Sequence, residues 1–432
     1  MTEFNPYAGN ILVDGLGPIL SRFDRQRRLM MIPTMPKDAI GAPRHLRLHV
    51  LARLRDLHIV RREDLRVADS IDLAIRESYR YRDPRLAATW GLVSAEPMLM
   101  QAPRAPAQSM VISGHSGTGK TDTVLRILHS YPAQVIKHMS FPRLEGPHFQ
   151  MTWLCVDVPP NGKAESLADV LMQAWDDTMT RANAEHVPRF WRTREAGRRD
   201  GARMLEEWRQ VATSHFLGVL VLDEVQNLFN LPALKARSRR GRVDASDDSA
   251  CLELSIVEDQ VLRWILTLMN TWGIALILIG TPDGVQGLMR RLAFAERAVT
   301  GGYHCMRVFG GMQDEEFSDY FLPSLTAFQG VAKPLHVSPE LGALLMELTA
   351  GIPRLLVALW VAAHRVAYEH KADTLTEADI RKAAGTYLAP VMPAVAALRS
   401  NDPRQMRRYE DLLPRDWDVW SDLFAQQVSA QV

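Results

Sequence analysis

The octapeptide GHSGTGKT at residues 114–121 is the feature that most constrains what this chain can fold into. It fits the pattern G-x-x-x-x-G-K-[ST] and stands between a short apolar stretch at 110–112 and a helical pattern of apolar residues at 124–128. A strand, a glycine-rich turn and a helix in this order bring successive N–H groups together around phosphate groups. The sequence therefore predicts a phosphate-binding loop within an α/β fold.

The residues of this loop have separate predicted tasks. Its glycines allow backbone conformations that are closed to other residues. Lys120 brings a positive charge to the β- and γ-phosphates of a nucleoside triphosphate, and the Thr121 hydroxyl is a ligand for Mg²⁺. The predicted nucleotide-binding residues of the loop are Gly114, His115, Ser116, Gly117, Thr118, Gly119, Lys120 and Thr121.

Apolar runs of strand length alternate with helical patterns through the middle of the chain, which is typical of a parallel sheet covered by helices. We expect strands at 109–113, 150–158, 217–222, 274–279 and 304–308, and later helices at 339–350, 353–370 and 376–388. The predicted fold class is α/β, a P-loop core with a five-stranded parallel sheet. A small helical lid follows this core, and a helical extension precedes it.

At 432 residues the chain exceeds the length at which one core usually stops growing. We place an N-terminal helical extension at 1–95, the nucleotide-binding core at 96–311, the lid at 312–390 and a tail at 391–432. In the tail, Trp417, Trp420 and Phe424 stand at helical spacing. They are expected either to dock a partner or to pack on the lid.

The composition and the N-terminal sequence bear on the cellular location of the protein and on its binding partners. Its three cysteines lie far apart, so neither a disulfide framework nor a zinc site is indicated. The N-terminus has no secretion signal and the longest apolar runs have only strand length, so we expect a cytoplasmic protein that does not span a membrane. The net charge of +1 leaves any binding of nucleic acid to local basic segments.

An acidic pair follows the apolar segment VLVL, at Asp223 and Glu224. Ligands of open α/β sheets bind at the carboxyl ends of strands, so Asp223 is expected to hold Mg²⁺, through water, together with Thr121. Glu224 is placed to orient and deprotonate the water that attacks the γ-phosphate. Helix capping is the alternative for both carboxylates, and their pairing with the phosphate loop favours the Mg²⁺ site.

Three further residues are candidates for the same chemistry. Thr281 follows the apolar segment ALILIG and is expected to sense the γ-phosphate or the water, unless it only starts a turn. Arg354 begins a lid helix and is expected to close over bound nucleotide. Arg297, near a Gly-Gly turn, is the chosen arginine finger for a neighbouring subunit's nucleotide, with a surface salt bridge as the alternative.

The order of phosphate loop, LDE strand, IGT strand end, arginine-bearing helix and GIPR resembles the initiator-type branch of AAA+ ATPases. The segments DEVQNL, LMNTWGIALILIGTP and AIRESYRYRDP resemble, more narrowly, the TnsC and TniB group of transposition ATPases, over roughly residues 65–390. This resemblance implies ATP as the nucleotide and a homo-oligomeric ring or filament on target DNA. It also implies a link between a target-selector protein and a transposase.

Two arginine-rich clusters are candidates for sequence-independent contact with double-stranded DNA, because guanidinium groups can follow a phosphate backbone. The first lies before the LDE strand and includes Arg198 and Arg199, and the second follows it and includes Arg237, Arg239 and Arg240. Solvated faces or a mobile loop are the alternatives.

Two other functions are compatible with the motifs. A replication initiator or loader shares the ATPase machinery but is expected to carry a C-terminal winged helix, which the irregular tail disfavours. A signalling scaffold that uses nucleotide only as a latch is disfavoured by the intact pair of Asp223 and Glu224.

Overall fold

The computed structural model describes residues 4–94, 105–186, 200–229, 256–289, 292–406 and 409. The chain forms two compact units. The sheet unit comprises Met1–Leu20, Arg66–Ser113 and Val124–His304, and the helical unit comprises Ser21–Leu65, Gly114–Thr123 and Cys305–Val432. The predicted phosphate loop therefore belongs to the helical unit. The region predicted as an N-terminal extension contributes to both units, and the predicted domain boundaries stay a prediction.

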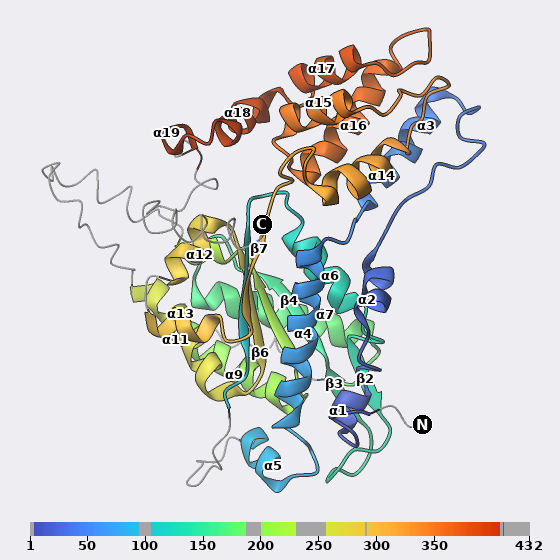
Figure 1. Cartoon of the computed structure of the whole chain (residues 1–432). Helices are drawn as coiled ribbons and strands as arrows, with labels where there is room; N and C mark the ends of the chain where they lie inside the picture. The colour runs from blue at the N-terminus through green and yellow to red at the C-terminus, as the bar shows by residue number, and fades with distance from the viewer. Residues whose placement is uncertain are drawn as a thin grey trace, which may run out of the picture. The chain divides into compact units, whose positions relative to one another are not determined.

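The sheet unit is built around a five-stranded sheet in the order β4-β5-β6-β1-β7 (Figure 1). Its strands are β1 (Ser109–Gly114), β4 (Trp153–Asp157), β5 (Val219–Asp223), β6 (Ala275–Gly280) and β7 (Gly302–Met306). The pairs β4 with β5, β5 with β6 and β6 with β1 are parallel. Every residue of β5 and β6 is buried, which explains their continuous apolar sequences. The predicted α/β fold class is confirmed.

The single strand predicted at 150–158 is wrong in one respect, because the chain changes partners at Thr152. Residues before it form β3 (His148–Met151), which pairs with β2 (Val135–His138) in an antiparallel hairpin. Residues after it form β4 in the main sheet. The Thr152 hydroxyl donates to the carbonyls of Ala133 and Gln134, at 2.9 and 3.0 Å, and so fixes the change.

Helices cover the sheet, and one group of them packs through tryptophans. The Trp208 ring lies 6.4 Å from that of Trp175 and 5.6 Å from that of Trp272. The helical elements of this unit are α1 (Ile11–Asp14), α5 (Ala87–Val93), α7 (Ala164–Arg181), α9 (Gly201–Ser214), η2 (Val225–Phe229), α11 (Ile256–Thr267), η3 (Leu268–Trp272), α12 (Pro282–Met289) and α13 (Leu292–Ala298). Helices α4 (Arg62–Arg80) and α6 (Lys120–His129) begin in the helical unit and continue in the sheet unit.

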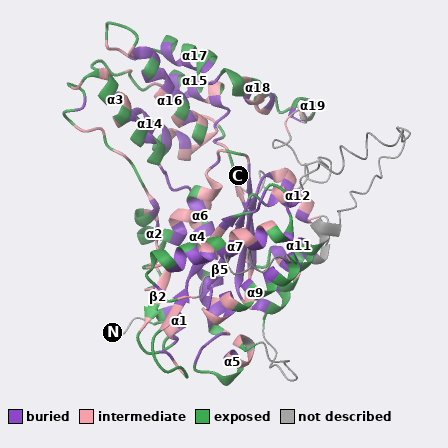
Figure 2. Cartoon of the chain, turned by 180° about the vertical axis from the view of Figure 1, so that it is seen from behind, coloured by how far each residue is buried: buried purple, intermediate pink, exposed green. Residues whose placement is uncertain are grey.

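The helical unit has its own apolar core, centred on α16. Leu356, Leu359 and Trp360 of this helix are fully buried, and Leu51 and Leu54 from the N-terminal segment join the same cluster. Figure 2 shows the buried stripe along α16. The helical elements are α2 (Arg22–Leu29), α3 (Arg44–Leu51), η1 (Ala52–Asp56), η4 (Glu316–Phe321), α14 (Leu322–Thr326), α15 (Pro339–Thr349), α16 (Pro353–Ala367), α17 (Glu377–Thr386), η5 (Ala389–Val391), α18 (Met392–Ser400) and α19 (Pro403–Met406).

A buried arginine ties the N-terminal segment into this core. Arg47 donates to the Gly330 carbonyl at 2.8 Å and forms two bonds of 3.1 and 3.0 Å to the Asp373 carboxylate. A guanidinium held this way keeps its charge compensated although its side chain is only 5% exposed. Segment 21–65 is thus an integral part of the helical unit.

Within the described residues, no single helix has both the length and the apolar composition that crossing a membrane requires. Helices α15 and α16 reach these limits only as a pair, and that pair is bent by 111°.

The fully buried His364 predicts a pH dependence of stability. Burial lowers the pKa of its imidazole from 6.5 to about 4, and its Nε2 has no hydrogen-bond partner among the described residues. The unfolded chain binds the proton more readily, so the free energy of unfolding falls as the pH drops from about 6.5 to about 4. The loss attributable to His364 is about 3 kcal/mol, at about 1.4 kcal/mol per pH unit.

Denaturant unfolding at several pH values measures this loss. We expect a shallower decline for His364→Leu and an unchanged decline for His336→Leu, which alters an exposed histidine. Equal slopes for His364→Leu and the unmodified chain would contradict the assignment.

Candidate nucleotide site

The phosphate loop adopts backbone conformations that only glycine accepts without strain. Gly117 and Gly119 have φ angles of +84° and +95°. A Cβ on Gly117 would also lie 2.9 Å from Cγ2 of Ile352 and 3.1 Å from Cβ of Arg354. Two constraints therefore favour glycine at 117: its left-handed backbone conformation and the close approach of Ile352 and Arg354.

The carbonyl groups of the loop are held by donors from several segments of the helical unit. The Lys120 ammonium donates to the carbonyls of Gly114 and His115, at 2.6 and 3.0 Å. The Thr118 carbonyl accepts from Nη2 of Arg61 at 2.9 Å, and the Gly117 carbonyl accepts from the N–H of Arg354 at 3.2 Å. These bonds fix the orientation of the peptide groups in the loop.

Arg354 is the second residue of α16, after Pro353, so its N–H belongs to the first turn, where helices leave N–H groups without internal partners. This N–H is the donor to Gly117. The structure thus places the Arg354 backbone beside the phosphate loop. Its role toward a nucleotide stays a prediction.

A cavity of about 730 Å³ opens beside the loop within the helical unit. This volume lies in the range of small-molecule sites, about 300–1,000 Å³. The phosphate loop, the N-terminal segment and the C-terminal helices all line it, and both the N-terminal segment and α16 contribute apolar and charged side chains. The lining includes Gly117, Thr118, Gly119, Asp122, Arg55, His58, Ile59, Arg61, Phe309, Arg354, Val361, Arg365 and Tyr387.

Sequence reasoning missed the contribution of residues 55–64 to this cavity. The signal was the apolar pair Ile59 and Val60 directly before the charged start of a helix, which is typical of a short extended segment entering a core. In the structure His58 exchanges both backbone hydrogen bonds with Met31, so residues 57–61 run extended.

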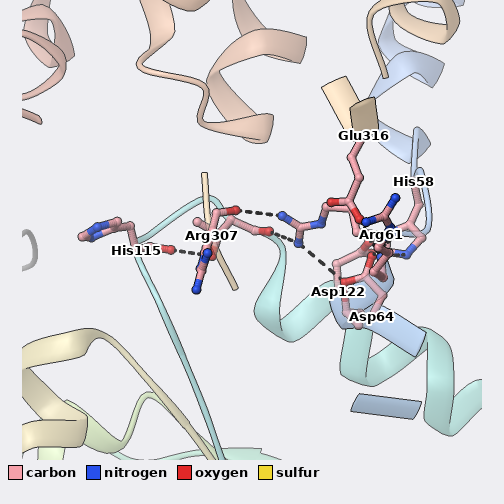
Figure 3. Close-up of polar contacts among 10 residues, drawn as sticks. His58, Arg61, Asp64, His115, Asp122, Arg307 and Glu316 are labelled. Atoms are coloured by element: carbon pink, nitrogen blue, oxygen red, sulfur yellow. Dashed lines mark hydrogen bonds and ion pairs between the residues drawn. The ribbon is translucent and has the colours of Figure 1, made fainter. Parts of the chain in front are cut away.

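A buried polar network joins this segment to the loop and to α6 (Figure 3). Asp64 is fully buried and accepts from the Arg61 N–H at 2.8 Å and from the Thr123 hydroxyl at 3.1 Å. At the edge of the network, Nδ1 of His58 lies 2.8 Å from Oδ2 of Asp122, whose side chain is 52% exposed. The buried polar atoms around Asp64 stabilise one arrangement of the chain because each alternative leaves some of them unpaired.

The predicted acidic pair lies in the sheet unit, at the end of β5. Asp223 is 2% exposed, and its Oδ1 accepts the Glu224 N–H at 2.7 Å. Asp157 is its register partner at the end of β4. Burial first, and then the charges of Asp223 and Asp157, raise the pKa of the Cys155 thiol to about 12. This strand end therefore carries concentrated negative charge, which suits a cation.

Gln226 connects Glu224 to the end of β6 and was not predicted. Its side-chain amide donates to the Glu224 carboxylate, and its Oε1 accepts the Thr281 N–H at 3.3 Å. Glu224 itself has a φ of +56°, which is uncommon for a residue other than glycine. The backbone of Gly284 approaches Gln226 so closely that a Cβ there would lie 2.4 Å from that of Gln226. The structure thus brings Glu224 and Thr281 together within the sheet unit.

Thr281 is buried, and its hydroxyl has no hydrogen-bond partner among the described residues. An uncompensated buried hydroxyl is costly, so such groups often have a functional reason. Its predicted role as a sensor of phosphate or water stays a prediction.

The remaining predicted residues are less informative. Arg297 lies on α13, with Nη1 3.7 Å from Oε1 of Glu296, and its role as an arginine finger stays a prediction. The predicted DNA contacts Arg198, Arg199, Arg237, Arg239 and Arg240 lie outside the described residues, as do Trp417, Trp420 and Phe424.

Comparisons with known proteins identify the core. Residues 104–289 match the family model of the AAA domain, which spans the phosphate loop, the acidic pair and Thr281. No curated protein matches the sequence. This part of the chain is therefore similar to AAA domains, and the narrower resemblance to the TnsC and TniB group stays a prediction.

Some solved structures show distant likenesses, on which we base no conclusion. A Walker-type ATPase of Pyrococcus abyssi has 15% identity and a TM-score of 0.41, over 69% of this chain and 72% of that one. The ORC1 protein of Aeropyrum pernix, in complex with DNA, has 13% identity and a TM-score of 0.40, over 75% of this chain and 67% of that one. Drosophila ORC bound to DNA has 15% identity and a TM-score of 0.38, over 77% of this chain and 69% of that one.

The geometry of the loop makes a prediction for Gly117→Ala. Because the new Cβ must accept a left-handed φ and displace Ile352 or Arg354, we expect nucleotide affinity to fall at least about tenfold, or about 1.4 kcal/mol. Fluorescence titration with a labelled ATP analogue measures this. Gly146→Ala is the matched control, because Gly146 has a φ of +93° but no neighbour within 4 Å. Equal affinities for both variants would contradict the account of the loop.

Proposed function

We propose that this protein binds ATP together with Mg²⁺, hydrolyses it, and uses the cycle to regulate DNA transposition. The observation that carries the nucleotide part is the meeting of the phosphate loop, Arg354 and a cavity of about 730 Å³ in one unit. The loop supplies N–H groups and a lysine for phosphates, and the cavity supplies space for a nucleoside.

The nucleoside occupies the cavity with its base between apolar and polar walls. Leu57 and Ile59 face it from the N-terminal segment, and Val361 and Ala362 face it from α16. Apolar side chains on both sides suit a flat aromatic base, whose burial is favourable. Arg354 and Arg365 supply positive charge toward ribose and phosphates.

The residues present fit a Mg²⁺ ion that arrives with the triphosphate. The described residues contain no group of three or more His, Cys, Asp or Glu side chains that could hold a metal without a substrate. Mg²⁺ usually keeps water and substrate phosphates as ligands beside one or two protein oxygens, and the Thr121 hydroxyl and the Asp223 carboxylate are the ligands predicted from the sequence. The ion neutralises charge that develops on the phosphates.

Hydrolysis depends on Glu224. Its carboxylate accepts a proton from water while the water oxygen bonds to the γ-phosphorus and the bond to the β–γ bridging oxygen breaks. Gln226 orients this carboxylate, and the Thr281 hydroxyl is the nearby donor for the water or the γ-phosphate. Arg297 of a neighbouring subunit stabilises the charge on the transferring group, so hydrolysis requires assembly.

The role in transposition rests on the segments DEVQNL, LMNTWGIALILIGTP and AIRESYRYRDP and on the AAA domain that contains two of them. ATP-bound subunits assemble as a ring or filament on double-stranded DNA without reading its sequence, and they join a target-selector protein to a transposase. Hydrolysis then disassembles the complex, so that the nucleotide state decides when insertion occurs.

Steady-state kinetics test the catalytic assignment. We expect Glu224→Gln to lower kcat at least about a hundredfold with ATP affinity nearly unchanged, because it removes the proton acceptor and leaves the phosphate loop intact. Gln226→Ala keeps the Glu224 carboxylate but removes the hydrogen bond that orients it, so the kcat of this variant should fall about tenfold. Full hydrolysis by Glu224→Gln would show that another group accepts the proton.

Sedimentation with linear duplex DNA tests the assembly. With a non-hydrolysable ATP analogue at low salt the chain should pellet with DNA of any sequence, and the bound fraction should fall steeply as salt rises. Retention of an integrase-type transposase on the pellet separates this function from that of a replication loader. A chain that stays in the supernatant at low salt would contradict assembly on DNA.

A further inference from the structure

Arg61 is a buried arginine that belongs to no recognised motif but touches the phosphate loop. It immediately precedes α4, and its side chain is only 9% exposed. Nη1 donates to the Arg307 carbonyl at 2.8 Å, and Nη2 donates to the Thr118 carbonyl at 2.9 Å (Figure 3). The guanidinium thus spans the loop and the chain that follows β7.

The bond to Thr118 fixes one peptide group of the loop. In a planar trans peptide the carbonyl of one residue and the N–H of the next point in opposite directions. Because Arg61 holds the Thr118 carbonyl, the Gly119 N–H is directed away from Arg61. Gly119 has a φ of +95°, and a Cβ built there would meet only Nη2 of Arg61, at 3.9 Å. Arg61 therefore lies on the side of this peptide opposite to its free N–H.

Asp64 holds the arginine in place. Its Oδ2 accepts the Arg61 N–H at 2.8 Å, and its Oδ1 lies 3.5 Å from Nη2 of Arg61. The Thr123 hydroxyl of α6 donates to the same carboxylate at 3.1 Å. Asp64 thus compensates the buried charge of Arg61 and connects it to the helix that the phosphate loop opens.

The contact works through geometry more than through charge. Only a planar guanidinium can donate in two fixed directions to two carbonyls, and a lysine ammonium at this place would lose the fork. The negative charge of Asp64, so close to the guanidinium, offsets most of its long-range attraction for phosphates. The Phe309 ring, 6.0 Å from the Arg61 guanidinium carbon, adds a flat apolar neighbour that limits its movement.

We propose that Arg61 is a positioning residue of the phosphate loop, which orients the Thr118–Gly119 peptide so that its N–H faces a bound polyphosphate. In this role Arg61 acts through the loop and makes the affinity for nucleotide depend on the segment before α4. The proposal rests on the proposed function for its ligand, ATP or ADP, and on the contacts of Arg61 for its geometry.

Two matched variants isolate this role. Arg47→Lys changes another buried arginine of the helical unit that bonds a carbonyl and a carboxylate, at Gly330 and Asp373, away from the loop. Arg62→Ala removes the neighbouring arginine, which is 79% exposed and pairs with Glu315 on the surface. Arg61→Lys is the test variant, because it keeps a positive charge and removes the fork.

Calorimetric titration with ATP and with ADP gives the first readout. We expect Arg61→Lys to raise both Kd values about tenfold and to leave kcat within about twofold, since ground-state and transition-state binding weaken together. Arg47→Lys and Arg62→Ala should bind as the unmodified chain does. Unchanged affinity in Arg61→Lys, or an equal loss in Arg47→Lys, would overturn the proposal.

Hydrogen exchange without nucleotide gives a second readout that does not depend on ATP. Peptides covering residues 115–121 should exchange faster in Arg61→Lys than in Arg47→Lys, because the Thr118 carbonyl has lost its anchor. Equal exchange in the two variants would overturn the proposal. If the unmodified chain bound no ATP while this difference persisted, the proposed function would fail and the positioning of the loop by Arg61 would stand.

Discussion

The phosphate loop depends on the way its carbonyl groups are satisfied. Lys120, Arg61 and the Arg354 N–H together hold the carbonyls of Gly114, His115, Gly117 and Thr118. Peptide groups that are fixed through their oxygens present their N–H groups in fixed directions, which is what recognition of phosphate requires. Segments that are remote in sequence, before β1 and after β7, supply two of these donors. The N-terminal segment that carries Arg61 also contributes Leu51 and Leu54 to the core of the helical unit.

The two units carry different parts of the chemistry. The helical unit holds the loop, Arg354 and the cavity, which together suit binding. The sheet unit holds Asp223, Glu224, Gln226 and Thr281, which suit the ion and the attacking water. In the sheet unit, the strand that ends at Asp223 is buried throughout, so its carboxylate is held at a defined point at the edge of the core. Gln226 then links the Glu224 carboxylate to the end of β6.

The sequence predicted what local patterns determine and missed what distant contacts determine. The strands β5 and β6 follow from their apolar runs, and the helix predicted at 339–350 is found as α15, which begins at Pro339. The bond between Arg47 and Asp373 joins residues 326 positions apart, so no periodicity could indicate it. The sequence analysis missed the contacts of Arg61 and Gln226 for the same reason, because only the folded backbone brings their partners close. The break at Thr152 was hidden because apolar residues continue on both sides of it.

Direct calorimetry with purified protein, Mg²⁺ and ATP tests the central claim that this loop and its cavity form a nucleotide site. The account predicts one saturable binding event per chain, which Lys120→Ala abolishes without changing the far-ultraviolet circular dichroism of the protein. The absence of binding heat with both ATP and GTP in the unmodified protein would contradict it.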